Sequence, residues 1–376
     1  MKYTSKNYSD LSSWVEVSTL EVAQSEVAEQ MCIIHTLGEG IAFDKQLNSI
    51  LNTYNRLKEE QPQYVPIFIR VFLSDSANQE LLVKNTINEN CPISIIEQPP
   101  LDGSKISIWV YFMSGVKVEN GNFSHNGYTH LWSVDEGKTN CNNSYIQTAQ
   151  LLDNYVADLA KVGATLLNDT IRTWFFVQNV DVNYKGVVEG RNAIFDQEGL
   201  LPSTHFITST GIGGRVADHN ITTVMDAYTV LGLEKEQIQF LYAPTHLNST
   251  YEYGVRFERG TAVHYGDRSH VFISGTASID NKGEVVHVGD IEKQVERMWE
   301  NVEVLLAETD CNFSNVAQMI VYLRDISDYT VVRKMYDKRF ADVPKVFVLA
   351  PVCRPTWLIE MECIAIKECL NEYPIF

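Results

Sequence analysis

The feature that most constrains the fold of this chain is an order of strand and helix signals that occurs three times along it. Alternating side chains predict strands, and apolar residues at every third or fourth position predict helices. In the last third, the predicted strands are 271–275, 284–288, 318–323, 345–349 and a final strand within 352–366, and the predicted helices are 291–305 and 329–340. The resulting order is β-β-α-β-α-β-β.

The two earlier thirds follow the same order, the first of them more faintly. In the middle third we predict strands at 128–134, 173–180, 205–210 and 222–231, with helices at 151–159 and 184–195. In the first third we predict strands at 30–36, 68–75, 92–96 and 106–111, with a helix at 47–57. These patterns predict a degenerate first unit at 1–115, a second at 116–235 and a third at 236–376.

A mixed sheet with two helices on one face leaves its other face to be buried against something else. Three copies in one chain can bury these faces on one another, as three subunits would. The sequence therefore predicts an α+β fold of tandem βαβαββ units that form an internal pseudo-trimer, with clefts between neighbouring units. The alternative that stays open is two copies preceded by an unrelated cap.

The final strand carries two carboxyl groups on a face that is otherwise apolar. Side chains alternate along a strand, so one face carries Leu358, Glu360, Glu362, Ile364 and Ile366. Arg354 lies in the turn just before it. Such a strand is either an edge with one wet face or the wall of a pocket. In a pocket, Arg354 would bind an anionic substrate and a carboxyl group would transfer a proton.

The formal net charge of −18 over 376 residues narrows the range of partners. Phosphate contacts need surfaces rich in lysine and arginine, so we expect no nucleic acid. An acidic chain is also unsuited to an anionic membrane. A small anionic substrate needs only a locally positive pocket, so the charge leaves that class of ligand open.

Other classes are disfavoured by the distribution of apolar and metal-binding residues. No apolar run is long enough for a signal peptide or a membrane span, and the seven cysteines are scattered without a C-x-x-C pair. This usage is typical of a reducing compartment, so we expect a cytoplasmic protein. The nine histidines show no metal-ligand spacing, and no motif indicates a cofactor. We therefore predict neither a metal nor a cofactor.

The βαβαββ unit resembles the RidA/YjgF superfamily, whose members are usually trimers with ligand sites between subunits. In that family an arginine before the last strand holds a substrate carboxylate and a glutamate on the strand lines the pocket; Arg354 and Glu360 lie at those places. A narrower resemblance is to the chorismatases, which cleave or rearrange chorismate. The stretches that carry it are 172–175, 201–214, 257–261, 272–279 and 353–363.

The chain departs from the chorismatase pattern at two points near the expected pocket. After Ile279 the sequence Asp280-Asn281-Lys282-Gly283 forms a plain hairpin turn in place of a Val-Gly-His-like continuation. Pro355 and Trp357 replace smaller or acidic residues after the arginine. These changes leave the substrate less defined than the fold.

Cleavage of an enolpyruvyl ether begins with protonation of its methylene carbon, and a buried carboxylic acid can supply that proton at neutral pH. Our candidates for the acid are Glu360 and, second, Glu362. Arg354 offers a bidentate fork for a carboxylate, and Arg259 is the best cation for a second one. The predicted turns of the other units, 99–103 and 211–214, lack a cation. We therefore predict one working site per chain.

The run from Ser209 to Gly214 is either a backbone nest for a carboxylate, involving Thr210, Gly211 and Gly213, or a hairpin that needs positive φ. Cys353 is expected to line the pocket without acting as a nucleophile, since no histidine is placed to activate it. The chorismatase resemblance alone adds Tyr184 and Thr276 as ligand contacts.

Three functions stay open. The first is a chorismatase-like hydrolase or lyase that acts on chorismate or a related cyclic carboxylate and releases pyruvate. The second is a RidA-like deaminase that hydrolyses a 2-imino acid. The third is a non-catalytic protein that binds a small carboxylate. In each of them we expect a small anionic ligand and either a monomer (the pseudo-trimer) or a homo-oligomer.

Overall fold

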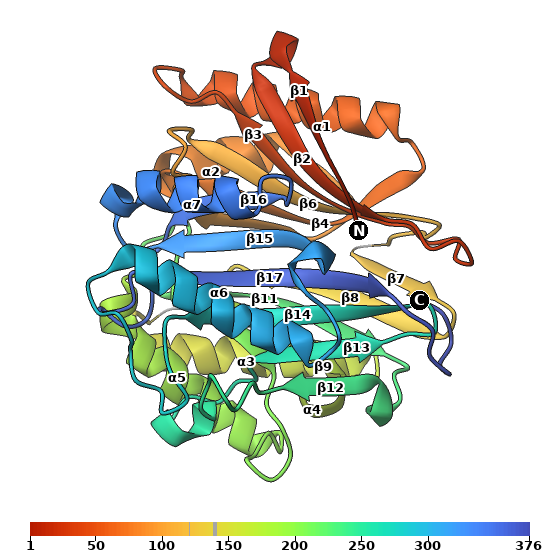
Figure 1. The fold of residues 1–376 in the computed structure, drawn as a ribbon, viewed down its shortest axis with the longest axis vertical. Helices are drawn as coiled ribbons and strands as arrows, with labels where there is room; N and C mark the ends of the chain where they lie inside the picture. The colour runs from red at the N-terminus through yellow and green to blue at the C-terminus, as the bar shows by residue number, and fades with distance from the viewer. Residues whose placement is uncertain (120, 138–140) are drawn as a thin grey trace.

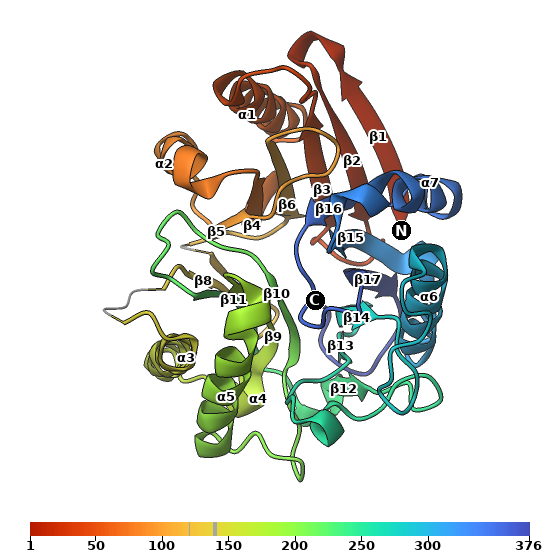
Figure 2. The same ribbon diagram turned by 90° about the vertical axis from the view of Figure 1, so that its left-hand side faces the viewer.

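The computed structural model describes residues 1–119, 121–137 and 141–376, and its strands form three separate mixed sheets (Figure 1). Each sheet carries helices on its outward side, and the three sheets face one another in the interior (Figure 2). This is an α+β fold of tandem RidA-like units.

The first sheet has the spatial order β1-β2-β3-β6-β4-β5. Its strands are β1 (Lys2–Tyr8), β2 (Ser13–Leu20), β3 (Glu29–Thr36), β4 (Tyr64–Leu73), β5 (Ile93–Glu97) and β6 (Ile106–Ser114). Its helices are η1 (Ser9–Leu11), α1 (Phe43–Glu60) and α2 (Ser76–Thr86). Helix α1 begins its apolar stripe at Leu47 and buries it on β2, β3 and β6.

The second sheet has the order β7-β8-β11-β9-β10. Its strands are β7 (Asn122–His125), β8 (Tyr128–Asp135), β9 (Thr170–Val177), β10 (Thr208–Gly213) and β11 (Thr223–Leu231). Its helices are α3 (Ser144–Lys161), α4 (Leu166–Asp169) and α5 (Val180–Gln197). The Asn143 side chain caps α3 by accepting from the backbone N–H of Ile146.

The third sheet has the order β12-β13-β14-β17-β15-β16. Its strands are β12 (Ile238–Leu241), β13 (Gly260–His264), β14 (Arg268–Ala277), β15 (Val316–Leu323), β16 (Lys345–Leu349) and β17 (Ile359–Glu368). Its helices are η2 (Lys235–Gln237), η3 (Thr250–Tyr253), α6 (Ile291–Ala307), η4 (Phe313–Asn315), η5 (Ile326–Asp328) and α7 (Tyr329–Arg339). Asp290 caps α6 by accepting from the backbone N–H of Lys293.

The strand registers show which positions in the three sheets are equivalent. In each sheet the edge strand runs parallel to its neighbour, as β5 does to β4, β10 to β9 and β16 to β15. The central strands β6, β11 and β17 then pair antiparallel with β4, β9 and β15. Through these pairings Ser107 lies opposite Phe72, Val224 opposite Phe176, and Glu360 opposite Tyr322. Of three equivalent positions, Glu360 alone is acidic.

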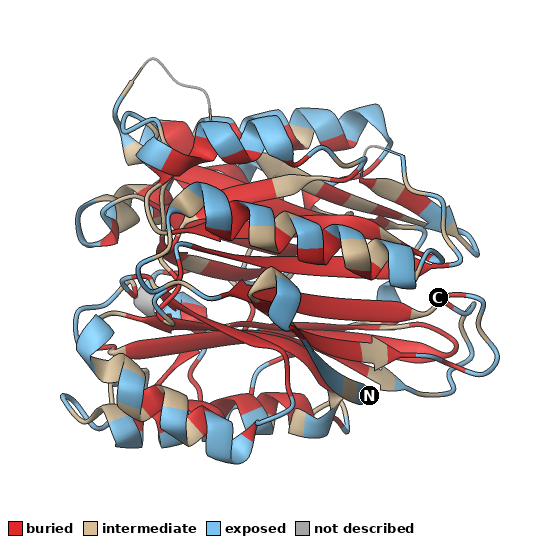
Figure 3. Cartoon of the chain, turned by 90° about the horizontal axis from the view of Figure 1, so that it is seen from above, coloured by how far each residue is buried: buried red, intermediate tan, exposed pale blue. Residues whose placement is uncertain are grey.

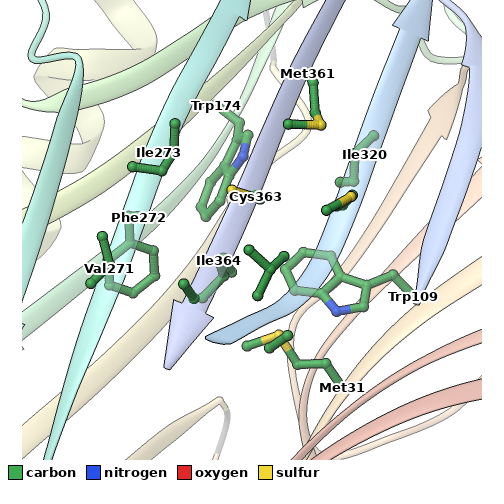
Figure 4. Packing of buried hydrophobic residues seen from close by; sticks show 14 of the residues in the cluster. Met31, Trp109, Trp174, Val271, Phe272, Ile273, Ile320, Met361, Cys363 and Ile364 are labelled. Carbon is green, nitrogen blue, oxygen red and sulfur yellow. The ribbon is translucent and has the colours of Figure 1, made fainter. Parts of the chain in front are cut away.

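The faces of the sheets that carry no helix pack on one another. One buried cluster draws on all three sheets, and in it the Trp132 ring lies 6.5 Å from that of Trp109 and 6.0 Å from that of Trp174. Figure 4 shows Trp109 and Trp174 among the side chains around β17. Apart from β1, β7, β8 and β12, the strands are buried almost throughout, whereas the helices expose their outward faces (Figure 3). Burial of the sheet faces supplies the main stabilisation of the assembly of units.

The prediction of a strand at 284–288 beside the strand at 271–275 was wrong. Residues 284–288 form no strand; a single bridge joins Ile279 to Val285, and Val288 is exposed. The antiparallel partner of β14 is instead β13, which precedes it in the chain. The turn at 280–283 was correctly identified, but the chain after it runs on into α6 because the sheet edge is already occupied.

The glycine-rich run is neither a hairpin nor a nest. Residues 208–213 form β10, paired in parallel with β9, and positive φ is found at neither Gly211 nor Gly213. These glycines allow close packing: a Cβ on Gly211 would lie 2.9 Å from the Tyr184 ring, and one on Gly213 would lie 2.8 Å from Pro351. The turn that follows contains Arg215, which pairs with Glu97 at 2.7 Å.

Candidate functional site

Glu360 lies on the central strand of the third sheet, where the second and third units meet. It pairs with Ala277 on β14 and Tyr322 on β15, and its side chain points out of the sheet towards β10. We use the name acid pocket for the cavity beside it. This pocket is lined by Tyr184, Arg191, Ser209, Thr210, Gly211, Val255, Phe257, Arg259, Gly275, Ala277, Ile279, Cys353, Arg354, Trp357 and Glu360.

The acid pocket has a volume of about 30 Å³. A water molecule needs on the order of 10–15 Å³ by this measure, so the pocket has room for two waters beside Glu360. Gly275 forms the wall nearest the carboxyl group, and a Cβ there would lie 1.9 Å from Glu360 Oε1. A glycine is therefore required at position 275 for the carboxyl group to occupy this place.

The Glu360 carboxyl group is only 4% exposed, and within the described residues it accepts no hydrogen bond. Burial raises its pKa to about 8, and the charge of Glu362 contributes in the same direction. The charges of Arg172 and Arg259 oppose this rise without cancelling it. At neutral pH the group is therefore mainly protonated, which gives it a proton to donate.

Glu362 faces the same side of β17 but has a very different environment. Its carboxylate accepts hydrogen bonds from Arg172 Nη2 at 2.8 Å, from Trp174 Nε1 at 2.7 Å and from the Thr210 hydroxyl. Arg70 Nη1 lies 3.7 Å away. Glu362 was our second candidate for the acid, but in this geometry its oxygens are engaged in a buried ion pair outside the acid pocket.

This ion pair continues across all three units. Arg70 comes from β4 of the first unit and also contacts Asp226 on β11 of the second unit, Nη2 to Oδ2 at 2.7 Å. Arg172 comes from β9 of the second unit, and burial lowers its pKa. All four charged side chains are less than 4% exposed. They compensate one another where no water can do so.

Three arginines line the acid pocket: Arg354, Arg259 and Arg191, of which Arg191 is buried. Arg354 is exposed in the turn before β17, and its guanidinium lies 5.4 Å from the Trp357 ring centre. Arg259 is 4% exposed and lies 5.3 Å from the Phe257 ring; its Nη2 donates to the backbone and side-chain oxygens of Asn248 at 3.1 Å. The pocket thus has one cation at its mouth and two in its wall.

Six of the eight predicted substrate-binding residues line the acid pocket: Arg354, Arg259, Cys353, Thr210, Gly211 and Tyr184. The structure does not bring the other two to it. Gly213 lines a separate cavity at the ends of the parallel edge strands, and the buried Thr276 hydroxyl donates to the Ser274 carbonyl at 2.9 Å. Burial raises the pKa of Cys353 to about 12, so its thiol stays protonated at neutral pH.

Sequence reasoning missed several residues of the acid pocket, including Ser209, Val255 and Gly275. It also missed Arg172 and Arg70 as partners of Glu362. The single signal in the sequence was that Arg70 and Arg172 are charged residues inside strongly apolar strands, which requires a buried counter-ion.

No group of three His, Cys, Asp or Glu side chains in the described part of the chain is placed to hold a metal ion. None of the helices described is both long enough and apolar enough to cross a membrane.

The fold and the site together define a protein made of RidA-type units, with its candidate site between two of them. The sequence profile of the family described as Endoribonuclease L-PSP matches residues 259–367. A RutC family protein of Pyrococcus abyssi is 36% identical over 101 residues, which are 26% of this chain and 79% of that protein. The chain therefore belongs to the RidA/YjgF (RutC) superfamily.

Within this superfamily the chain is related to the chorismatase group. It is 24% identical over 222 residues to the 3-hydroxybenzoate synthase of Streptomyces hygroscopicus, covering 52% of this chain and 63% of that protein, less than two thirds of its length. A crystal structure of a chorismatase aligns with a TM-score of 0.63 and 20% identity over 80% of this chain and 93% of that one. At this identity the structural likeness shows the fold.

Proposed function

We propose that the protein is a chorismatase-like enzyme that cleaves the enolpyruvyl ether of chorismate, or of a related cyclic carboxylate, and releases pyruvate. The observation that carries the proposal is Glu360, a carboxyl group whose raised pKa keeps it protonated in a small pocket that Arg354, Arg259 and Arg191 also line. The similarity to 3-hydroxybenzoate synthase supports the same class of substrate.

In the proposed reaction, Glu360 donates its proton to the methylene carbon of the enol ether, which becomes a methyl group. The adjacent carbon then carries an oxocarbenium ion, and a water molecule adds to it. The hemiketal that results breaks its bond to the ring oxygen, giving pyruvate and a ring alcohol. The proton lost by the attacking water restores the acid, so that Glu360 acts first as acid and then as base.

The surroundings of Glu360 fit each need of this reaction. Arg354 and Arg259 are placed to bind the carboxylates of the substrate. The pocket has room for the attacking water beside the buried Glu360 carboxyl group. The low polarity that raises the pKa of Glu360 also strengthens the attraction of its carboxylate for the cationic intermediate.

A second candidate is a RidA-like imine hydrolase, which the small volume of the acid pocket favours because it suits a ligand of few atoms. In that reaction Arg354 would hold the carboxylate of a 2-imino acid while water attacks the imine carbon. A non-catalytic carboxylate-binding protein is the remaining alternative. For all three we propose a small anionic ligand, no nucleic acid or membrane partner, and a monomer or homo-oligomer.

The direct test is to incubate the protein with chorismate and measure pyruvate by a coupled assay. We expect release by the parent protein and none by Glu360→Gln. Glu368→Gln, on the exposed end of the same strand, is the matched control and should keep full activity. Absence of pyruvate with the parent protein, together with turnover of 2-aminoacrylate, would replace the first proposal with the second.

A further inference from the structure

A second and larger cavity adjoins the acid pocket. It has a volume of about 440 Å³ and lies between residues 201–206 of the second unit and residues 242–259 of the third, with Asn281 at its side. We call it the outer cavity. Phe257 and Arg259 line both cavities, so the two adjoin at these side chains.

The outer cavity owes its walls to a segment found in the third unit and not in the other two. Strands β12 and β13 are joined by residues 242–259, whereas β1 and β2, at the same places in the first sheet, are joined by residues 9–12. In the described part of the second sheet β7 corresponds to β13, and no strand corresponds to β12. Long connections in compact domains are uncommon and are usually functional or disordered. This one is ordered around a cavity and belongs to the unit that carries Glu360.

The lining of the outer cavity suits a ring. The aromatic side chains of Phe206, Tyr242, Tyr251 and Phe257 supply flat apolar surface, and the Phe206 and Tyr251 rings are stacked 6.5 Å apart. Flat apolar walls bind the faces of a six-membered ring, while a few polar groups fix its orientation.

Two of the polar groups that line the outer cavity, Arg259 and Glu258, are buried. Arg259 lies at the junction with the acid pocket, where its charge acts on Glu360. Glu258 is 7% exposed and accepts a hydrogen bond from the Phe206 backbone N–H at 2.8 Å. The junction thus favours a carboxylate, and the Glu258 carboxyl group can accept a hydrogen bond from a ring hydroxyl.

The two cavities differ in size and suit different parts of one substrate. The acid pocket, at about 30 Å³, cannot take a six-membered ring, whereas the outer cavity, at about 440 Å³, lies within the usual range for ligand pockets. A 2-imino acid of a few atoms would leave the outer cavity unused. The presence of the outer cavity beside the acid pocket therefore favours a substrate with a ring.

We propose that the outer cavity is the subsite for the ring of a cyclic hydroxy carboxylate, whose reactive side chain reaches Glu360 past Arg259 and Phe257. The part of this proposal that concerns the reactive side chain at Glu360 rests on the function proposed above. The ring subsite itself depends only on the outer cavity, so the two can fail separately.

The test fills the outer cavity without touching the acid pocket. Ser249 is exposed, lines the outer cavity and makes no capping hydrogen bond at the start of η3, so Ser249→Trp should fill the cavity and leave the fold intact. Ser203→Trp, at an exposed position outside both linings, is the matched control. The probe is 3-hydroxybenzoate, a ring with a carboxylate and a hydroxyl, with binding measured by calorimetry.

We expect the parent protein and Ser203→Trp to bind the probe equally, and Ser249→Trp to bind it at least tenfold more weakly. If the parent does not bind the probe, or if Ser249→Trp binds it as the parent does, the ring subsite is refuted. If the parent does not release pyruvate from chorismate, the reaction at Glu360 is refuted. The ring subsite is then still decided by the binding experiment.

Discussion

Glu360 and Glu362 lie two residues apart on one face of β17, yet they have opposite surroundings. Glu362 accepts hydrogen bonds from Arg172, Trp174 and Thr210, whereas Glu360 faces a small cavity and has a pKa raised to about 8. The charge held at Glu362 is itself one cause of that raised pKa. A structural ion pair thus helps to keep its neighbour protonated.

Replacement of the acid should remove activity and stabilise the fold. We expect Glu360→Gln to lower kcat for pyruvate release by at least about 10²–10⁴-fold, the usual contribution of a general acid. A carboxyl group with a raised pKa favours folding at low pH, and this contribution is lost as the pH rises from the unfolded value towards 8. Urea denaturation at pH 8.5 should therefore show Glu360→Gln to be more stable than the parent. A lower stability at that pH would contradict the assigned pKa.

The pH dependence of the reaction should follow the protonation of Glu360. Because the acid must carry its proton, kcat/KM for chorismate should be constant in the neutral range and fall tenfold per pH unit above about 8. A stopped assay between pH 6 and 10 measures this directly. A rate that rises through pH 8 would indicate that the ionised group acts as a base, as the imine hydrolase would allow.

Loss of the second carboxylate should be a stability defect. Glu362→Gln leaves Arg172 buried without its counter-ion, which costs about 3–5 kcal/mol of unfolding free energy in comparable buried pairs. Chemical denaturation followed by fluorescence of the buried tryptophans would measure it. Glu368→Gln, on the same strand but exposed, should change the free energy of unfolding by less than about 0.5 kcal/mol.

The arginine at the mouth of the acid pocket should affect binding more than folding. A hydrogen-bonded charge pair contributes roughly 1.5–3 kcal/mol, so Arg354→Ala should raise the KM for chorismate about 10- to 100-fold. Because Arg354 is exposed, the thermal unfolding midpoint should hardly change. An unaltered KM would mean that another cation, such as Arg259, binds the carboxylate. Lys338→Ala, an exposed substitution on α7, serves as control.

The cleft between the first and third units carries acids where the candidate site carries arginines. By strand register Glu16, before Val17, corresponds to Arg259, before Gly260. Asp102, like Arg354, lies in the turn before the central strand. Both carboxylates lie 3.6 Å from nitrogens of the buried His35 ring, which stacks on Trp14. The His35 side chain therefore fills the cleft between the first and third units.

This filled cleft predicts a pH-dependent contribution to stability. Burial alone would lower the pKa of His35, but the neighbouring Asp102 and Glu16 raise it overall. A raised histidine pKa stabilises the fold fully below about pH 6.5, and the effect is lost as the pH rises through the folded value. His35→Gln should therefore be less stable than the parent at pH 6, with a difference that shrinks towards pH 9. Of the two cations next to Glu16, Arg333 has a raised pKa and keeps its charge over this range, whereas burial lowers the pKa of Lys345. A difference that is constant from pH 6 to 9 would contradict the prediction.

The sequence by itself determined the repeating unit, the tandem order of its strands and helices, and the face of the final strand that carries Glu360 and Glu362. These features depend on periodicity and on local turn chemistry, which are written in neighbouring residues. The same local reasoning placed a strand at 284–288 and left a nest or a hairpin as the alternatives for 209–214. It could not see that β13 already occupied the edge beside β14, or that β10 pairs in parallel with β9.

The tertiary structure alone decided which carboxyl group is the candidate acid. The groups that contact Glu362 come from β4, β9 and β10. Those that line the cavity beside Glu360 come from the turn just before β17 and from α5, β10, β14 and the segment 242–259, all but the first of which lie far from β17 in the chain. A carboxyl group's proton affinity depends on distances to charges and on exclusion of water, and both are fixed only when the three sheets pack together.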